Sequence, residues 1–153
     1  MPYEIDQSNK IEVGRKPTAL ALTNDDDYSI AIPANERRAA FAAVQNRYER
    51  KSVTIMFFTA AVYFLVRELP AGATVSIDCE YTGKERYIRG LLLQWLRDDR
   101  PDITADRITF GQVGRKSRAH KTALAIHRGE READRTLRAD DLVAQITGSK
   151  KAK

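Results

Sequence analysis

In the first third of the chain, hydrophobic residues gather in short runs separated by polar residues, a pattern typical of β-strands. Three such runs are Tyr3–Ser8, Thr18–Thr23 and Tyr28–Ile32. The stretch Asn24–Asp27 between the last two predicts a tight turn, because Asn and Asp side chains hydrogen-bond to nearby backbone. Pro33 has no amide hydrogen for a sheet, so it should end the third strand. The pattern therefore predicts a three-stranded meander.

After Pro33 the hydrophobic period becomes that of a helix. One helix is predicted from Ala34 to Arg50, with small apolar residues on one side and arginines elsewhere. A second is predicted from Ser52 to Leu69, and because it is apolar nearly all round it should lie in the core. Its most apolar stretch, Val53–Val66, has about 14 residues, too few to span a bilayer.

The rest of the chain alternates between strand and helix patterns. The predicted elements are a strand at Ala73–Asp78, a helix at Lys84–Arg97, a strand at Ile108–Val113, a helix at Lys116–Arg128 and a short helix at Ala139–Ile146. Residues 129–138 are predicted as an exposed charged stretch, and 148–153 as a flexible basic tail. A meander followed by alternating α and β units predicts a single α/β domain over residues 1–147, with a mixed five-stranded sheet and helices on both faces.

Composition narrows the class of protein. A chain of 153 residues with 42% hydrophobic residues can bury a core. The net charge of +5 favours a polyanionic partner such as DNA or RNA. The single cysteine, Cys79, excludes an internal disulfide and a cysteine-based zinc cluster. We expect a cytoplasmic protein without a membrane partner, because this cysteine usage fits a reducing compartment and no signal-peptide pattern follows Met1.

The candidate metal-binding and catalytic residues lie in three segments that are far apart in the sequence. Asp6 lies at the polar end of the first predicted strand, Asp78 at the end of the fourth, and His120 on a late helix. Adjacent strands can bring Asp6 and Asp78 to about 5 Å from each other. Carboxylates that close repel, and a divalent cation such as Mg²⁺ or Mn²⁺ relieves the repulsion. Glu80 follows Asp78 by two residues, so it shares the same face if the strand continues, and it is a reserve ligand.

Each candidate also has a simpler interpretation, which the sequence leaves open. Asp6 can be a polar residue at a strand edge, Asp78 a turn former, Glu80 a solvated side chain, and His120 a helix-start histidine bonded to a carbonyl. His127 lies two turns after His120, and at a helix end it is more often a partner of the helix dipole. The run Asp25–Asp27 is better explained as a solvated hairpin turn than as a metal loop.

Basic residues form two groups that are candidates for contacts with nucleic acid. The candidates are Arg37, Arg38 and Arg47 on the first predicted helix, and Arg115, Lys116, Arg118 and Lys121 around the turn Gly111–Ser117. In that turn, Ser117 is placed to cap a helix whose N-terminus attracts phosphate. A plain turn and a solvated helix face remain the alternatives for the two groups.

In this order, the residues resemble the ribonuclease H-like superfamily of nucleases, integrases and Holliday-junction resolvases. The family's first acid matches Ile5-Asp6-Gln7-Ser8, and its middle acid matches Ile77-Asp78-Cys79-Glu80-Tyr81. Its last metal ligand, on the closing helix, matches Ala119-His120 after the Gly111–Gly114 turn. The resemblance implies a ribonuclease H-like fold and metal-dependent hydrolysis of phosphodiester bonds. Asp6, Asp78 and His120 would then be catalytic, with Asp6 bridging two Mg²⁺ (or Mn²⁺) ions.

The chain departs from this family at two places. The apolar helix from Ser52 to Val66 carries no acid, whereas ribonuclease H proper has a Glu there, so resolvase-type members are the better match. A resolvase that cuts junctions would be a homodimer. The helix at about 34–50 has no counterpart and is interpreted as an insertion that grips nucleic acid. The alternatives are a non-catalytic nucleic-acid-binding protein of the same fold and a protein-interaction module.

Overall fold

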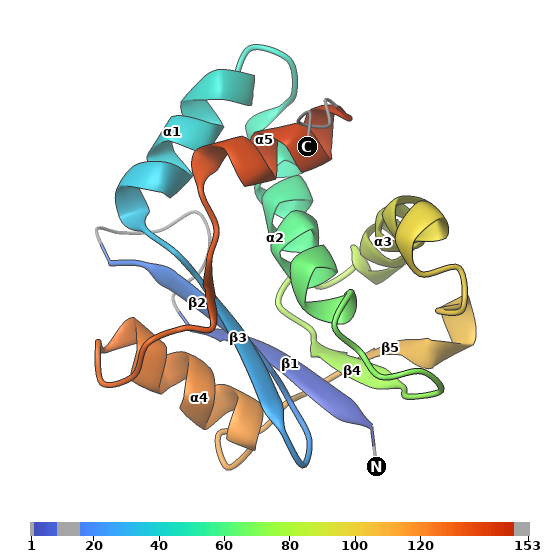
Figure 1. Ribbon diagram of the computed structural model, residues 1–153. Coiled ribbons are helices and arrows are strands. Elements are labelled where there is room, and N and C mark those ends of the chain that lie inside the picture. Colours follow the sequence, from blue (N-terminus) through green and yellow to red (C-terminus); the bar gives the residue numbers. More distant parts are fainter. Residues whose placement is uncertain (1, 9–15, 149–153) are drawn as a thin grey trace.

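The structure is a computed structural model that describes residues 2–8 and 16–148. Those residues form one six-stranded mixed sheet and five α-helices (Figure 1). The strands are β1 Tyr3–Ser8, β2 Thr18–Thr23, β3 Asp27–Ile32, β4 Val75–Asp78, β5 Ile108–Gly111 and β6 Arg135–Thr136. The helices are α1 Ala34–Val44, α2 Arg50–Val66, α3 Glu85–Asp99, α4 Arg118–His127 and α5 Ala139–Thr147, with a 3-10 turn at Ala105–Arg107. The predicted tail lies, beyond Gly148, outside the described residues.

The strands follow the order β5-β4-β1-β2-β3-β6 across the sheet. β1, β2 and β3 form the predicted antiparallel meander. β4 pairs in parallel with the other side of β1, and β5 pairs in parallel with β4. Parallel neighbours need a crossover connection, and helices precede both strands. The mixed α/β architecture predicted from the sequence is therefore confirmed.

The predicted number of five strands is wrong, because β6 makes a sixth. It consists of Arg135 and Thr136, within the stretch that the sequence predicts as exposed and charged, and it pairs in parallel with β3. Leu137 continues this contact: its amide donates to the carbonyl of Ala31, and its side chain is fully buried. A strand of two residues is too short to show a hydrophobic period, so the sequence pattern does not reveal it.

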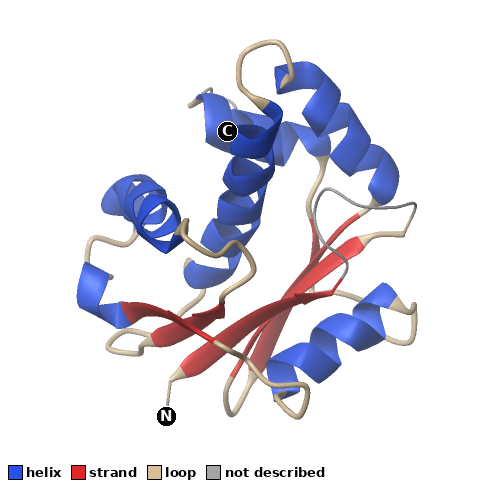
Figure 2. Cartoon of the chain, turned by 180° about the vertical axis from the view of Figure 1, so that it is seen from behind, coloured by secondary structure: helices blue, strands red, loops and turns tan. Residues whose placement is uncertain are grey.

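Helices cover both faces of the sheet, as predicted. α4 lies along β1 and β2 on one face, whereas α2 packs on the other face with α3 and α5 around it (Figures 1 and 2). Thirteen of the residues of α2 are buried, from Val53 to Val66, which confirms its predicted place in the core. No helix among the described residues has the length and apolarity needed to cross a membrane.

The predicted helix at 34–50 is interrupted, and one of its three predicted nucleic-acid contacts is buried. α1 ends at Val44, and α2 already begins at Arg50. α1 packs against α5. Arg37 is only 3% exposed, and its guanidinium donates to the Lys16 carbonyl at 3.1 Å and to the Thr18 hydroxyl at 2.9 Å. Arg37 therefore ties α1 to the beginning of β2, and the expectation that it contacts phosphate is wrong.

We predict that Arg37→Ala lowers the free energy of unfolding by about 2–3 kcal/mol, because it removes buried hydrogen bonds from a charged donor. The neighbouring Arg38, which is exposed, supplies the control: Arg38→Ala should leave stability nearly unchanged. Urea denaturation followed by circular dichroism measures both variants. Equal stabilities of the two variants would contradict the structural role given to Arg37.

Candidate metal centre

Parallel pairing of β1 with β4 brings the first two predicted acids together. Ile5 lies opposite Ile77 in the register of the two strands, so the next residues, Asp6 and Asp78, are neighbours at the same sheet edge. Both carboxylates project to the same side, because side chains alternate along each strand and the two strands are in step. The predicted proximity of Asp6 and Asp78 is thus borne out by the register of the sheet.

Glu80 joins this pair by a route that the sequence does not predict. β4 ends at Asp78, so Glu80 does not share its face by strand continuation. Instead the chain turns, and the amide of Glu80 donates to the carbonyl of Asp78 at 2.9 Å. The turn then leads into α3 through Gly83, whose φ of 85° favours glycine. Glu85 fixes this segment by accepting from the amide of Gly83 at 2.9 Å.

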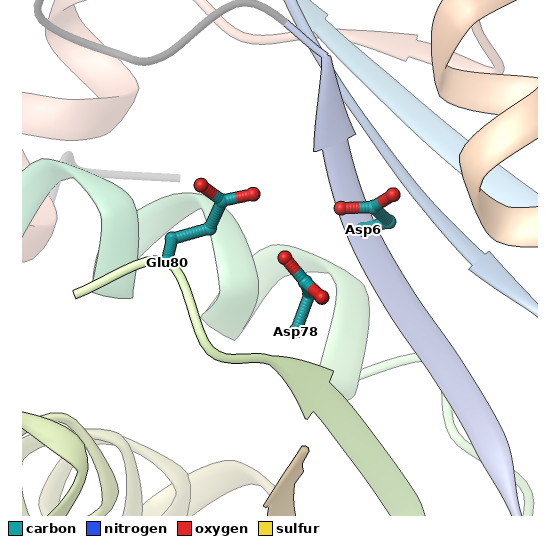
Figure 3. Close-up of side chains that lie close together, drawn as sticks. All are labelled: Asp6, Asp78 and Glu80. Carbon is teal, nitrogen blue, oxygen red and sulfur yellow. The ribbon is translucent and has the colours of Figure 1, made fainter. Parts of the chain in front are cut away.

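The three carboxylates form one compact cluster, which we call the acidic cluster: Asp6, Asp78 and Glu80 (Figure 3). One oxygen of each lies within 4.8 Å of the others. Asp6 is 4% exposed, and the other two are partly buried. The alternative interpretation of Glu80 as a freely solvated side chain does not hold.

Crowding and burial change the protonation of the acidic cluster. Burial raises the pKa of Asp6 above its usual value; the hydrogen bond with His120 opposes this rise, and the charge of Asp78 adds to it. Burial, a hydrogen bond with Asp78 and the charges of Asp78 and Asp6 together raise the pKa of Glu80 to about 7. Near neutral pH, Glu80 is therefore still partly protonated, and a divalent cation bound by the cluster would displace that proton.

His120 stands beside the acidic cluster and contacts one of its members. It lies in the first turn of α4, and its Nδ1 is 2.8 Å from Oδ2 of Asp6. The side chain is 29% exposed. With Nδ1 facing a carboxylate, the ring is oriented by Asp6, and Nε2 is the nitrogen left for other chemistry. The structure therefore places His120 one hydrogen bond from the cluster and not among its clustered ligand atoms.

The loop between β5 and α4 is attached to the same place. The amide of Val113 donates to Oδ1 of Asp78 at 2.8 Å, and the amide of Cys79 donates to the carbonyl of Gly111 at 2.9 Å. Ser117 caps α4 as predicted, accepting from the amide of Ala119 at 3.0 Å. The loop that carries Arg115 and Lys116 is thus held next to the acidic cluster.

Gln7 is a residue that the sequence analysis does not identify. Gln7 is 7% exposed, and within residues 2–8 and 16–148 neither its amide nitrogen nor its amide oxygen has a hydrogen-bond partner. The amide nevertheless acts on Glu80, where it opposes the rise in pKa. The two therefore lie side by side without the geometry of a full hydrogen bond. The only sequence signal is the position of Gln7 directly after Asp6, which by itself implies the opposite face of the strand.

The basic residues predicted to contact nucleic acid differ in whether they form ion pairs within the protein. Arg118 is exposed but engaged: it pairs with Asp27 at 3.0 Å and donates to the carbonyls of Asn24 and Asp25. The others are exposed and, within residues 2–8 and 16–148, take part in no ion pair: Arg38, Arg47, Arg115, Lys116 and Lys121. Of these, Arg115 and Lys116 are in the loop attached to the acidic cluster.

Two further candidates have structural roles. Nδ1 of His127 lies 3.0 Å from the carbonyl oxygen of Pro17, so this ring ties the end of α4 to the beginning of β2. Asp27, in the run of three aspartates, pairs with Arg118 and with Arg131. Asp26 accepts from the hydroxyl of Tyr3. The aspartate run therefore stabilises the β2–β3 turn, and neither feature belongs to the acidic cluster.

The chemistry of the site is inferred from these residues alone. Comparisons of the chain with protein-family models, with curated proteins and with solved structures find no match. Three carboxylate oxygens are a donor set that suits a hard divalent cation such as Mg²⁺ or Mn²⁺.

The raised pKa of Glu80 predicts a specific pH dependence of stability in the absence of divalent cations. The pKa is about 7 in the folded protein and 4.5 ordinarily, so the unfolded chain gives up its proton first as pH rises. The stabilising contribution of protonated Glu80 is present below pH 4.5 and disappears as pH rises through 7. Over this range it amounts to about 2 kcal/mol, once solvent screening of the partly exposed carboxyl is allowed for.

Urea denaturation in EDTA between these pH values measures the effect as a difference between proteins. Glu80→Gln mimics the protonated carboxyl, so its stability relative to the wild type should increase with pH. The exposed Glu132 provides the control, because Glu132→Gln should follow the wild type at every pH. A constant difference between Glu80→Gln and the wild type would contradict the prediction.

Proposed function

We propose that this protein is a metal-dependent nuclease, with a ribonuclease H-like fold, that hydrolyses phosphodiester bonds in DNA or RNA. The observation that carries the proposal is the acidic cluster, whose oxygens lie within 4.8 Å of one another in a protein of net charge +5. The strand order β5-β4-β1-β2-β3, with a meander followed by parallel strands, supports the fold assignment. β6 is an addition at the far edge.

Asp6, Asp78 and Glu80 would hold Mg²⁺ or Mn²⁺ in this proposal. Bound there, the cation supplies charge neutralisation at a phosphate and lowers the pKa of a bound water. Asp6 is suited to a central position, since it is the most buried of the three and lies between Asp78 and His120. Asp78 is oriented by the amide of Val113, which leaves its second oxygen for the cation.

His120 would move protons at this site. Its Nδ1 contacts Asp6 and fixes the orientation of the ring, whereas its partial exposure gives Nε2 access to substrate. An imidazole held in this way can protonate a leaving oxygen or accept a proton from an attacking water. α2 packs on the sheet but carries no carboxylate. In this proposal His120 and Glu80 therefore join Asp6 and Asp78 as the functional groups of the site.

Arg115 and Lys116 supply the expected contacts with the phosphate backbone. Both are exposed, and their loop is anchored to Asp78 through the amide of Val113. Cations beside an acidic cluster favour a polyanionic substrate over a small neutral one, and they position the backbone without selecting a base sequence. This arrangement supports nucleic acid as the substrate class.

We expect the protein to bind Mn²⁺ and to cleave at least one nucleic acid in a reaction that EDTA abolishes. Suitable substrates are single-stranded, duplex, hybrid and four-way-junction molecules. Asp6→Asn and Asp78→Asn should each lower the cleavage rate by about 100-fold or more. Each substitution weakens binding of a cation that would stabilise the transition state by several kcal/mol. Calorimetry with Mn²⁺ and a gel assay measure the two effects.

The matched control is Asp25→Asn, which changes an exposed carboxylate in the β2–β3 turn. Its Mn²⁺ affinity and cleavage rate should equal those of the wild type. Binding of nucleic acid that persists in EDTA, with no cleavage of any substrate, would favour the non-catalytic alternative. No affinity for nucleic acid at low salt would leave the protein-interaction alternative.

The basic loop generates a separate prediction about salt. Lys116→Ala should weaken binding of nucleic acid and reduce the slope of log K against log salt concentration by about 1, since one phosphate contact is lost. Arg128, at the other end of α4, is the control, and Arg128→Ala should leave the slope unchanged. Fluorescence anisotropy with the Asp78→Asn protein measures binding without cleavage. Identical slopes for the two variants would remove the loop from the binding surface.

A further inference from the structure

Gln7 is a buried amide whose hydrogen-bonding capacity is unused. It is only 7% exposed, and its Nε2 and Oε1 both lack hydrogen-bond partners in the part of the chain that the structure describes. Buried polar side chains almost always find partners, and leaving one unpaired lowers stability. A buried amide of this kind is expected where a ligand supplies the missing partners or where the site changes between two states.

The position of Gln7 points to the acidic cluster. Its own backbone amide donates to Oδ1 of Asp6 at 2.9 Å, so the residue is joined to the first acid. Its side-chain amide lies beside Glu80 and opposes the rise in the pKa of that carboxyl. Gln7 is thus next to two members of the cluster, Asp6 through its backbone and Glu80 through its side chain.

We propose that Gln7 is a positioning residue of the cation site, and that its amide makes its two missing hydrogen bonds when a divalent cation binds. The N–H group would then donate to the carboxylate of Glu80, one of the three ligands of the cation. The carbonyl oxygen accepts from a water of the hydrated cation, and Mg²⁺ and Mn²⁺ keep such waters. This inference rests on the cation site of the proposed function but not on nuclease activity.

The effect expected of such a residue on the cation is sizeable. Gln7 is the buried neutral amide next to Asp6, and an outer partner of this kind typically changes metal affinity by about 10–100-fold.

The first test compares stability with metal affinity in Gln7→Met, which keeps the length of the side chain and removes its polar atoms. Without metal, the thermal midpoint should rise by roughly 2–4 °C, because an unpaired buried amide is removed. The Mn²⁺ dissociation constant should increase by about 10-fold or more. Gln145→Met, on α5 and partly buried, is the matched control and should leave Mn²⁺ affinity unchanged. A Gln7→Met protein with wild-type Mn²⁺ affinity overturns the proposal.

The second test uses the wild-type protein and so does not depend on folding of the variant. In ¹⁵N-resolved NMR spectra, the side-chain NH₂ signals of Gln7 should shift on addition of Mg²⁺, in parallel with the backbone signals of Asp78 and Glu80. The NH₂ signals of Gln145 should stay in place. If the signals of Asp78 and Glu80 move and those of Gln7 do not, the proposal is overturned.

The outcomes separate this inference from the proposed function. If Mn²⁺ binding requires Gln7 but the protein cleaves no nucleic acid, the inference is supported and the proposed nuclease function is overturned. Metal-dependent cleavage with wild-type rate and wild-type Mn²⁺ affinity in Gln7→Met supports the nuclease and overturns the inference. Failure of the wild-type protein to bind Mn²⁺ overturns both.

Discussion

Ile5 of β1 lies opposite Ile77 of β4, and this parallel register fixes the relative positions of Asp6 and Asp78. A shift of one residue would turn one carboxylate to the other face of the sheet and the neighbouring isoleucine out of the core. Because both isoleucines are buried, the hydrophobic core maintains the register. α4 and the β5–α4 loop contribute to the site through their contacts with Asp6 and Asp78. These contacts depend on the strand register that places the two acids side by side.

Close approach of acids has an electrostatic cost, and the groups around the acidic cluster are arranged to reduce it. Asp6 accepts from the amide of Gln7 and contacts His120, and Asp78 accepts from the amide of Val113. Retention of a proton by Glu80 removes part of the remaining charge. These contributions lower the electrostatic cost of keeping three buried or half-buried acids close together.

The elements that the sequence predicts well are those whose signal is local. The meander follows from apolar runs bounded by turn residues, and α2 follows from a long apolar stretch. The elements missed are those that other parts of the chain create. β6 exists because β3 offers a free edge to Arg135 and Thr136. The buried Arg37 resembles any other arginine of a helix until the backbone of Lys16 is placed beside it.

For the candidate site, the sequence alone determined the chemical groups and their places at strand ends: Asp6 and Asp78 were identifiable because carboxylates at the ends of adjacent strands meet. Only the tertiary structure decided how the other residues reach them. Glu80 arrives through a turn after β4, His120 through the packing of α4 on β1, and Gln7 through burial beside Glu80. The physical reason is that a strand or helix period fixes only the direction of a side chain relative to its own backbone. Burial and hydrogen-bond partners depend on which remote segment packs against it.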